Sequence, residues 1–236
     1  MRLRPFFGYF GSKWKLASKY PEPMYRTIIE PFAGSAGYAL YHHFGHDVIL
    51  CDANETVADM WDMLIHSDPS VIESIPDDPR ADVSHLTETQ RALMGFWFAK
   101  APVAPRKTIS PWAEKYPGSS WWGRKIKDRI IEQMPYISTW SIVKGDYREL
   151  DNIEATWYID PPYQHHGNMY PKGAKGFDFK ALGEWCQSRK GQIIVCEGEG
   201  ADWLPFRPFH DGKRSTGQNS GVGPSEVIWT NEGDSD

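Results

Sequence analysis

The sequence has few cysteines and no long apolar run. Three cysteines occur in its 236 residues, Cys51, Cys186 and Cys196, and no two of them have the C-x-x-C spacing of a zinc or redox site. No apolar stretch approaches the ~18 residues that a membrane span needs, and the first residues are not followed by the apolar core of a signal peptide. These absences exclude a disulfide framework and predict a soluble, cytoplasmic protein without a membrane segment, whose thiols are reduced and mostly buried.

The composition is otherwise that of a globular protein. Hydrophobic residues make up 40% of the chain, aromatic residues 14% and charged residues 24%, which excludes a disordered or fibrous chain. The length favours one large domain, or a domain that carries an insertion. The net charge of −5 excludes a surface that is basic throughout, but residues 100–129 contain eight basic and two acidic residues, a local net charge of +6.

Strand and helix patterns alternate in two parts of the sequence. Residues 27–29 predict a strand, a glycine-rich turn follows, and a helix runs to Gly45; a second strand at 48–51 precedes a helix that Asn54 caps. This order predicts an α/β fold with a parallel sheet covered on both faces and a binding site at the carboxyl ends of its strands. After residue 139 the alternation resumes, with strands predicted at 140–143, 156–159, 192–196 and 226–230 and a helix at 178–190.

The stretch between these two parts has a different character. Residues 68–138 contain eight prolines around two segments with helical patterns, 87–100 and 119–134. We therefore predict one domain formed by residues 1–67 and 139–236, interrupted by a mainly helical insertion at 68–138.

The most specific motif is Asp160-Pro161-Pro162-Tyr163, directly after an apolar strand. Two prolines make a stiff turn, so the motif could serve only to end the strand. At the carboxyl end of a parallel strand, however, this turn holds a carboxylate, prolyl carbonyls and an aromatic face at the ligand-binding edge. Such a cluster suits an exocyclic amine on a planar base, because the oxygens accept its two N–H bonds while Tyr163 stacks on the ring.

A second motif joins a glycine-rich turn to an acidic residue. Residues 30–37 read Glu-Pro-Phe-Ala-Gly-Ser-Ala-Gly, and Asp52 ends the next strand. The glycines admit a ligand close to the backbone, and a carboxylate about twenty residues further along suits ribose hydroxyls. The G-x-G-x-x-G pattern of dinucleotide sites is absent, and Glu30 would repel a pyrophosphate at the helix N-terminus. A cationic nucleoside without phosphate, such as S-adenosylmethionine (AdoMet), fits better.

Two further segments are hypotheses for the same site. Residues 8–13 are either a flexible start or a loop over a cofactor, with Tyr9 on the cofactor body and Lys13 on its carboxylate. Asp146 and Tyr147, at the end of another strand, form either an ordinary turn or a contact with a nucleobase.

The basic residues of 100–129 alternate with the aromatic Trp112, Tyr116, Trp121 and Trp122. A charge run is usually a solvated surface. Here the cations could instead bind the phosphates of double-stranded DNA while an aromatic ring fills the gap left by a flipped base. Arg124 or Lys125 is the predicted reader of a base edge. The residues predicted to contact DNA are Arg106, Lys107, Trp121, Trp122, Arg124 and Lys125.

The histidines do not indicate a metal site. His42 and His43 are adjacent, as are His165 and His166, and neither pair has the i, i+4 spacing with which a helix holds a metal. We therefore predict no metal. His165 and His166 follow Tyr163 and either line the pocket of the target base or lie exposed.

In chain order, these motifs resemble the Dam-like, α-group DNA N6-adenine methyltransferases, many of them from phages and prophages. The resemblance covers nearly the whole chain. Ser12 stands where a second glycine is common in the family, and Ala36 alters the usual glycine pattern. The matching parts are the N-terminal Phe10-Gly11-Ser12-Lys13, the E-P-F-x-G-x-x-G motif of residues 30–37, the acidic position Asp52, a target-recognition insertion, Asp146, and D-P-P-Y at 160–163.

The resemblance implies a Rossmann-like class I AdoMet-dependent methyltransferase core with a mainly helical target-recognition insertion. It implies site-specific transfer of a methyl group to adenine N6 of a flipped-out base, as in restriction-modification, with Asp160 ionised and accepting the amine together with the Pro161 carbonyl. The catalytic positions are Asp160, Pro161, Pro162 and Tyr163. The cofactor positions are Tyr9, Phe10, Gly11, Lys13, Glu30, Pro31, Phe32, Ala33, Gly34, Gly37, Asp52, Ala53, Asp146 and Tyr147.

Other functions fit parts of the same pattern. The same turn could hold the N4 amine of cytosine, which is conjugated in the same way. Methylation of RNA or of a protein side chain is a more distant alternative, and Asp rather than Asn before Pro-Pro-Tyr disfavours the glutamine-modifying kind. A DNA-binding module that has lost turnover is the alternative outside enzymes. No oligomeric state and no recognition sequence follow from the sequence.

Overall fold

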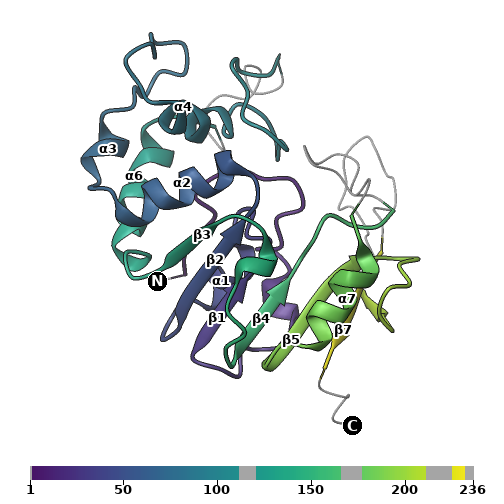
Figure 1. Ribbon diagram of the computed structural model, residues 1–236. Helices are drawn as coiled ribbons and strands as arrows, with labels where there is room; N and C mark the ends of the chain where they lie inside the picture. Colours follow the sequence, from purple (N-terminus) through teal and green to yellow (C-terminus); the bar gives the residue numbers. More distant parts are fainter. Residues whose placement is uncertain (1, 112–120, 166–176, 211–224, 232–236) are drawn as a thin grey trace.

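A seven-stranded sheet forms the centre of the molecule (Figure 1). The computed structural model describes residues 2–111, 121–165, 177–210 and 225–231. Its strand order is β3-β2-β1-β4-β5-β7-β6; the strands β1 to β5 are parallel, and β7 runs antiparallel to both β5 and β6. The strands are β1 (Thr27–Glu30), β2 (Asp47–Asp52), β3 (Ser141–Lys144), β4 (Ala155–Ile159), β5 (Gly191–Gly198), β6 (Arg207–His210) and β7 (Glu226–Thr230).

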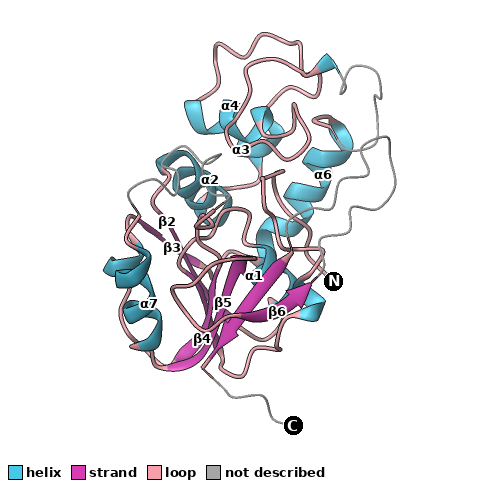
Figure 2. Ribbon diagram, turned by 90° about the vertical axis from the view of Figure 1, so that its right-hand side faces the viewer, coloured by secondary structure: helices cyan, strands magenta, loops and turns pink. Residues whose placement is uncertain are grey.

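Helices cover both faces of this sheet (Figures 1 and 2). Successive strand residues point to opposite faces: Ile28 and Tyr158 join a core with α1 and α2, whereas Ile29 and Trp157 join a second core with α7. The helices are α1 (Gly37–His42), α2 (Glu55–His66), α3 (Ser70–Glu73), α4 (Glu88–Gly95), α6 (Arg124–Gln133) and α7 (Phe179–Gln187), with short 3₁₀ turns η1 (Ala17–Lys19), η2 (Met134–Tyr136) and η3 (Tyr147–Glu149).

The predicted Rossmann-like α/β core is confirmed. All five residues of β4 are buried, as expected of a continuous apolar strand inside a parallel sheet. The Asn54 side chain accepts a hydrogen bond from the Thr56 backbone N–H at 3.1 Å and caps α2, as its sequence position predicts. Among the described residues, no helix combines the length and apolar character needed to cross a lipid bilayer.

Several predicted elements have different bounds. The first helix begins at Gly37 and ends at His42, short of Gly45, and the helix expected at 87–100 ends at Gly95, where Phe96 to Phe98 continue as turns. Strand β6 was not predicted, because Pro208 is unfavourable in a strand interior; its place at the sheet edge makes that proline tolerable.

Residues 70–136 contain α3, α4, α6 and η2, joined by described segments without regular structure such as 76–86 and 99–110; we call this stretch the helical part (Figures 1 and 2). It has no core of its own. Phe96, after α4, packs against Phe7 with ring centroids 5.4 Å apart, and Phe7 in turn packs on Trp61 of α2. All three side chains are fully buried in the core that continues to the sheet. The N-terminal segment therefore joins the helical part to the sheet.

A buried lysine joins α6 to the segment that follows α3. Lys127 is 3% exposed, and its Nζ donates to the carbonyl oxygens of Glu73 at 3.0 Å and Ile75 at 2.6 Å and pairs with Asp77 at 2.8 Å. This ammonium supplies the hydrogen bonds that the two carbonyls need away from water.

We predict that Lys127→Met lowers the free energy of unfolding by about 2–4 kcal/mol, because it removes a charged donor and leaves two carbonyl groups without a partner. Lys125→Met is the matched control on the exposed side of the same helix and should change stability by less than about 0.5 kcal/mol. Urea denaturation of both variants measures the difference. Equal stability of the two variants would contradict the structural role of Lys127.

Candidate active site

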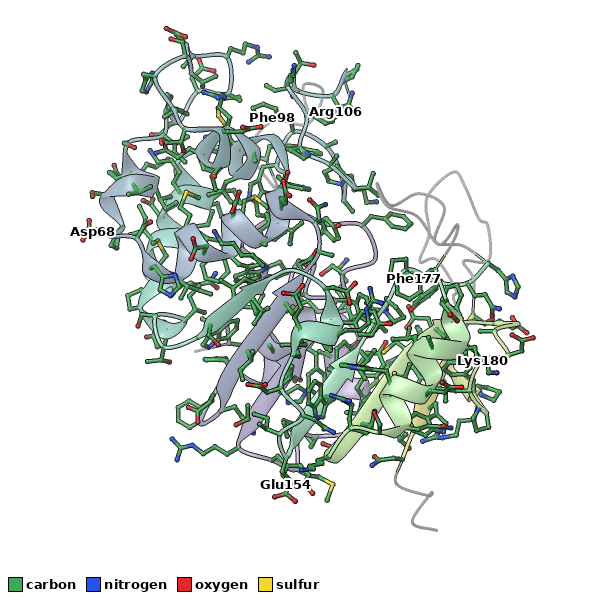
Figure 3. The ribbon with its side chains drawn as sticks, in the orientation of Figure 1. Asp68, Phe98, Arg106, Glu154, Phe177 and Lys180 are labelled. Carbon is green, nitrogen blue, oxygen red and sulfur yellow. The ribbon has the colours of Figure 1, made fainter. Side chains whose placement is uncertain are left out.

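A cavity of about 540 Å³ lies at the carboxyl ends of β1, β2 and β4. In Figure 3, Phe177 lies toward the helical part, where Phe98 and Arg106 are labelled, whereas Glu154, directly before β4, lies at the opposite edge of the sheet. The cavity thus lies at the edge where parallel sheets bind ligands. Its lining consists of Tyr9, Phe10, Gly11, Ser12, Lys13, Glu30, Phe32, Ala33, Gly34, Ser35, Gly37, Asp52, Ala53, Asn54, Glu55, Thr56, Tyr158, Asp160, Pro162 and Phe177.

Most positions predicted for the cofactor line this cavity; Pro31, Asp146 and Tyr147 are not among its lining residues. Asp146 caps η3 and pairs with Arg148 at 2.6 Å, and Tyr147 packs behind Phe32 with ring centroids 5.2 Å apart. Several lining residues were not predicted as part of a site. Asn54, Glu55 and Thr56 follow Asp52 and Ala53 at a strand end, which is a usable signal, whereas Phe177 belongs to no motif.

The glycine-rich turn is tied to the end of β2. Gly34 has a left-handed backbone, with φ of 46°, and its N–H donates to Asp52 Oδ2 at 2.8 Å; the other oxygen of Asp52 accepts from Asn54 N–H at 2.8 Å. Ala36 also adopts the left-handed conformation, with φ of 49°. The Asp52 carboxylate therefore fixes two loops around the cavity and keeps further acceptor capacity.

The N-terminal segment lies on the start of α1. A Cβ at Gly37 would lie 2.6 Å from the Trp14 backbone nitrogen and 3.1 Å from the Lys13 backbone, so only glycine admits this contact. Ser12 accepts a hydrogen bond from Ser35 Oγ at 2.8 Å. This bond also ties the N-terminal segment to the glycine-rich turn.

Glu30 is a buried carboxyl group at the end of β1, 2% exposed. Its Oε1 accepts from the Ala39 N–H of α1 at 2.6 Å. Burial raises the pKa of Glu30 to about 8, the bond from Ala39 opposes this, and the nearby Asp160 charge adds to the rise. Glu30 therefore carries a proton at neutral pH in the unliganded protein, and an N–H group at the start of α1 is already bound to a carboxyl oxygen.

Asp160 pairs with Lys13 across the cavity. Lys13 Nζ donates to Asp160 Oδ2 at 3.0 Å, with side chains 6% and 19% exposed. Burial raises the pKa of Asp160, and the Lys13 ammonium opposes that rise. The second oxygen, Oδ1, is buried and has no hydrogen-bond partner among the described residues. Lys13 thus pairs with a carboxylate of the protein itself, whereas its sequence position predicts a contact with a cofactor carboxylate.

The rest of the Asp-Pro-Pro-Tyr turn is held by two side chains. The Lys13 ammonium lies 4.9 Å from the centre of the Tyr163 ring, and Tyr163 Oη is buried without a hydrogen bond in the described part of the chain. Glu197, which is fully buried in β5, accepts from the backbone N–H of Gln164, directly after the turn. Pro161 is buried and is not part of the lining, whereas Pro162 faces the cavity.

The six residues predicted to contact DNA differ in their exposure and in their contacts within the protein. Arg106, Lys107 and Lys125 are exposed. Trp122 is 4% exposed and donates its indole N–H to the Pro76 carbonyl at 2.7 Å, and Arg124 pairs with Glu73 and Asp128. Trp121 is partly buried.

Other members of the basic stretch also bind within the protein or lie outside the described residues. Lys127 is buried as described above, and the Arg129 guanidinium lies over the Trp97 ring at 5.1 Å. His165 is exposed, with Nε2 3.1 Å from the Gly200 carbonyl. Trp112, Lys115, Tyr116 and His166 lie outside the described residues. Within the described ranges, no group of three or more His, Cys, Asp or Glu residues could hold a metal ion.

Comparison with known proteins adds little to this geometry. No protein-family model and no curated protein matches the chain. Among solved structures, the "putative methyltransferase yhhF" of Escherichia coli is 8% identical, with a TM-score of 0.38 over 92% of this chain and 80% of that one. A conserved hypothetical protein of Streptococcus pyogenes is 10% identical, with a TM-score of 0.37 over 93% and 92%. A likeness this distant says nothing about activity, which has to be inferred from the site itself.

The raised pKa of Glu30 predicts a pH-dependent stability. Because the folded protein holds this proton up to about pH 8 while an unfolded glutamate loses it near 4.5, the free energy of unfolding should fall between these values, by at most about 1.4 kcal/mol per pH unit. Glu30→Gln removes the ionisable group, so urea denaturation at pH 5 and pH 8.5 should show a smaller loss for this variant. Glu55→Gln, at an exposed lining position, is the control and should keep the wild-type slope. A wild-type slope in Glu30→Gln would contradict the assignment.

Proposed function

We propose that the chain is an AdoMet-dependent DNA methyltransferase that methylates adenine N6 on a flipped-out base. The observation that carries this proposal is the buried Asp160 Oδ1, which lacks a partner among the described residues at the edge of a cavity lined by a glycine-rich turn. A buried acceptor without a donor is costly, and an incoming N–H group would satisfy it.

The lining fits a cationic nucleoside. Four of its side chains are acidic, Glu30, Asp52, Glu55 and Asp160, whereas Lys13 is its one basic side chain within the described ranges. A phosphate-bearing dinucleotide fits poorly, because the Ala39 N–H of α1 is bound by Glu30. The volume is in the range of small-molecule sites.

Six lining side chains have roles in this proposal. Asp52 accepts the ribose hydroxyls, Glu30 compensates the positive charge, and Phe32 and Phe177 offer apolar faces to a base. AdoMet supplies an electrophilic methyl carbon attached to a positively charged sulfur. Asp160, ionised and held by Lys13, accepts an N–H of the exocyclic amine and draws its lone pair toward the electrophile.

A strongly basic Asp160 is unnecessary in this scheme. The N6 lone pair is delocalised into the adenine ring, so the amine is a weak nucleophile until the carboxylate orients it. As the new N–C bond forms, the methyl–sulfur bond of AdoMet would break and leave a neutral thioether; the amine proton then becomes acidic, and in this proposal Asp160 accepts it. The base must leave the duplex to reach this position, at a cost of a few kcal/mol.

We predict that Asp160→Ala and the isosteric Asp160→Asn lower the rate of methyl transfer at least 100-fold, because both remove the anionic acceptor, while AdoMet affinity changes less than about threefold. Transfer of labelled methyl groups to unmethylated DNA measures the rate, and calorimetry measures the affinity. Asp151→Asn, at an exposed position, is the control. Near-wild-type transfer by Asp160→Asn would overturn the catalytic assignment, and N4-methylcytosine in digested DNA would identify the alternative substrate.

The exposed cations of the helical part predict salt-dependent DNA binding. Arg106→Gln and Lys107→Gln should each lower the slope of log affinity against log salt by up to about 0.9, the value for one lost phosphate contact. Lys190→Gln is an exposed control directly before β5, at the opposite edge of the sheet, and should leave the slope unchanged. Fluorescence anisotropy with a DNA duplex measures both. A flat salt dependence for the wild-type protein would contradict phosphate contacts.

A further inference from the structure

Lys13 lies between two carboxylates from different strands. Its Nζ is 3.0 Å from Asp160 Oδ2, at the end of β4, and 3.8 Å from Glu226 Oε1, the first residue of β7. It also donates to the Gly11 carbonyl at 3.0 Å. With 6% exposure, Lys13 has little access to water, so these groups determine where its ammonium lies.

Glu226 is held in place by Tyr20, through the carboxylate oxygen other than the one nearest Lys13. Its Oε2 accepts a hydrogen bond from Tyr20 Oη at 2.8 Å. The Tyr20 ring stacks on Phe209 of β6 with centroids 4.5 Å apart and meets Tyr158 edge-on at 5.1 Å. Glu226 is not among the lining residues of the cavity. The ion pair with Lys13 is therefore a contact that links Glu226 to the cavity.

The three N–H groups of the Lys13 ammonium are shared among its neighbours. The lysine ammonium has three N–H bonds. One donates to the Gly11 carbonyl and one to Asp160 Oδ2. The attraction of Glu226 draws the ammonium away from a second contact with Asp160. Asp160 Oδ1 has no well-oriented hydrogen-bond partner among the described residues, and the nearby Tyr163 hydroxyl lowers the pKa of Asp160. Without Glu226, the ammonium would be free to move fully onto the Asp160 carboxylate and cover both of its oxygens.

We infer that Glu226 is a positioning residue that, by holding Lys13, keeps one oxygen of Asp160 open for the amino group of the substrate. This inference rests on the proposed function. The Lys13 ammonium stays charged in this setting: burial lowers its pKa, but Asp160, Tyr163, Glu226 and, more weakly, Cys196 raise it well above the usual value.

Glu226→Gln tests the inference, because it keeps an acceptor for Tyr20 and removes the charge. We expect kcat for methyl transfer to fall about tenfold or more, as for a misplaced reacting group, with KM for AdoMet changed less than about twofold. Glu226 raises the pKa of Asp160, so the acid limb of the kcat profile should move to lower pH in this variant. Glu226→Asp should restore part of the rate. Glu199→Gln, a nearby exposed glutamate, is the control and should keep wild-type values.

A readout without ligand separates this inference from the proposed function. Carboxyl NMR of the unliganded protein, with Asp160 assigned through Asp160→Asn, should show Asp160 titrating at lower pH in Glu226→Gln than in the wild type. Wild-type protein that transfers no methyl group would refute the proposed function alone, and this titration then shows whether the charge of Glu226 acts on the Lys13–Asp160 pair. An unmoved titration, or wild-type kcat in Glu226→Gln, would overturn the inference.

Discussion

The buried ion pair between Lys13 and Asp160 is the contact on which the candidate site depends. Two charges away from water are costly unless each satisfies the other, so the N-terminal segment and the end of β4 must take up their positions together. Both residues line the cavity, and the second oxygen of the carboxylate is buried without a hydrogen-bond partner among the described residues. Sequence motifs nearly 150 residues apart thus become one functional unit through a single contact.

The N-terminal segment that carries Lys13 also connects the cavity to the helical part. The Phe10 N–H donates to the Pro102 carbonyl at 3.1 Å, and Tyr9, which lines the cavity, packs on Phe96 with ring centroids 5.8 Å apart. On the other side, Gly37 admits the Lys13 backbone against α1. The helical part and Lys13 are therefore connected through one short segment of the chain.

The sequence predicts the parts of this structure that depend on local pattern. Continuous apolar strands gave β4 and β5, and the Asp-Pro-Pro-Tyr and glycine-rich motifs identified both ends of the cavity. It does not predict contacts that depend on how distant segments meet. The charge run of residues 100–129 does not reveal that Lys127 is buried, and nothing near Glu226 indicates that it faces Lys13. Only the packed fold reveals these contacts, because the sequence around a helical lysine is the same whether its ammonium binds carbonyl oxygens or water.

Three carboxyl groups around the cavity differ in their ionisation because their surroundings differ. Asp52 accepts two backbone N–H bonds, which stabilise its anion, and Asp160 has an ammonium partner. Glu30 accepts a bond from the Ala39 backbone and has no cation within the described contacts, so burial keeps it protonated to about pH 8. A group of this kind destabilises the fold when it ionises, and its retention in a cavity is explained if a ligand supplies the missing positive charge. The same ionisation that destabilises the fold would then favour a cationic ligand.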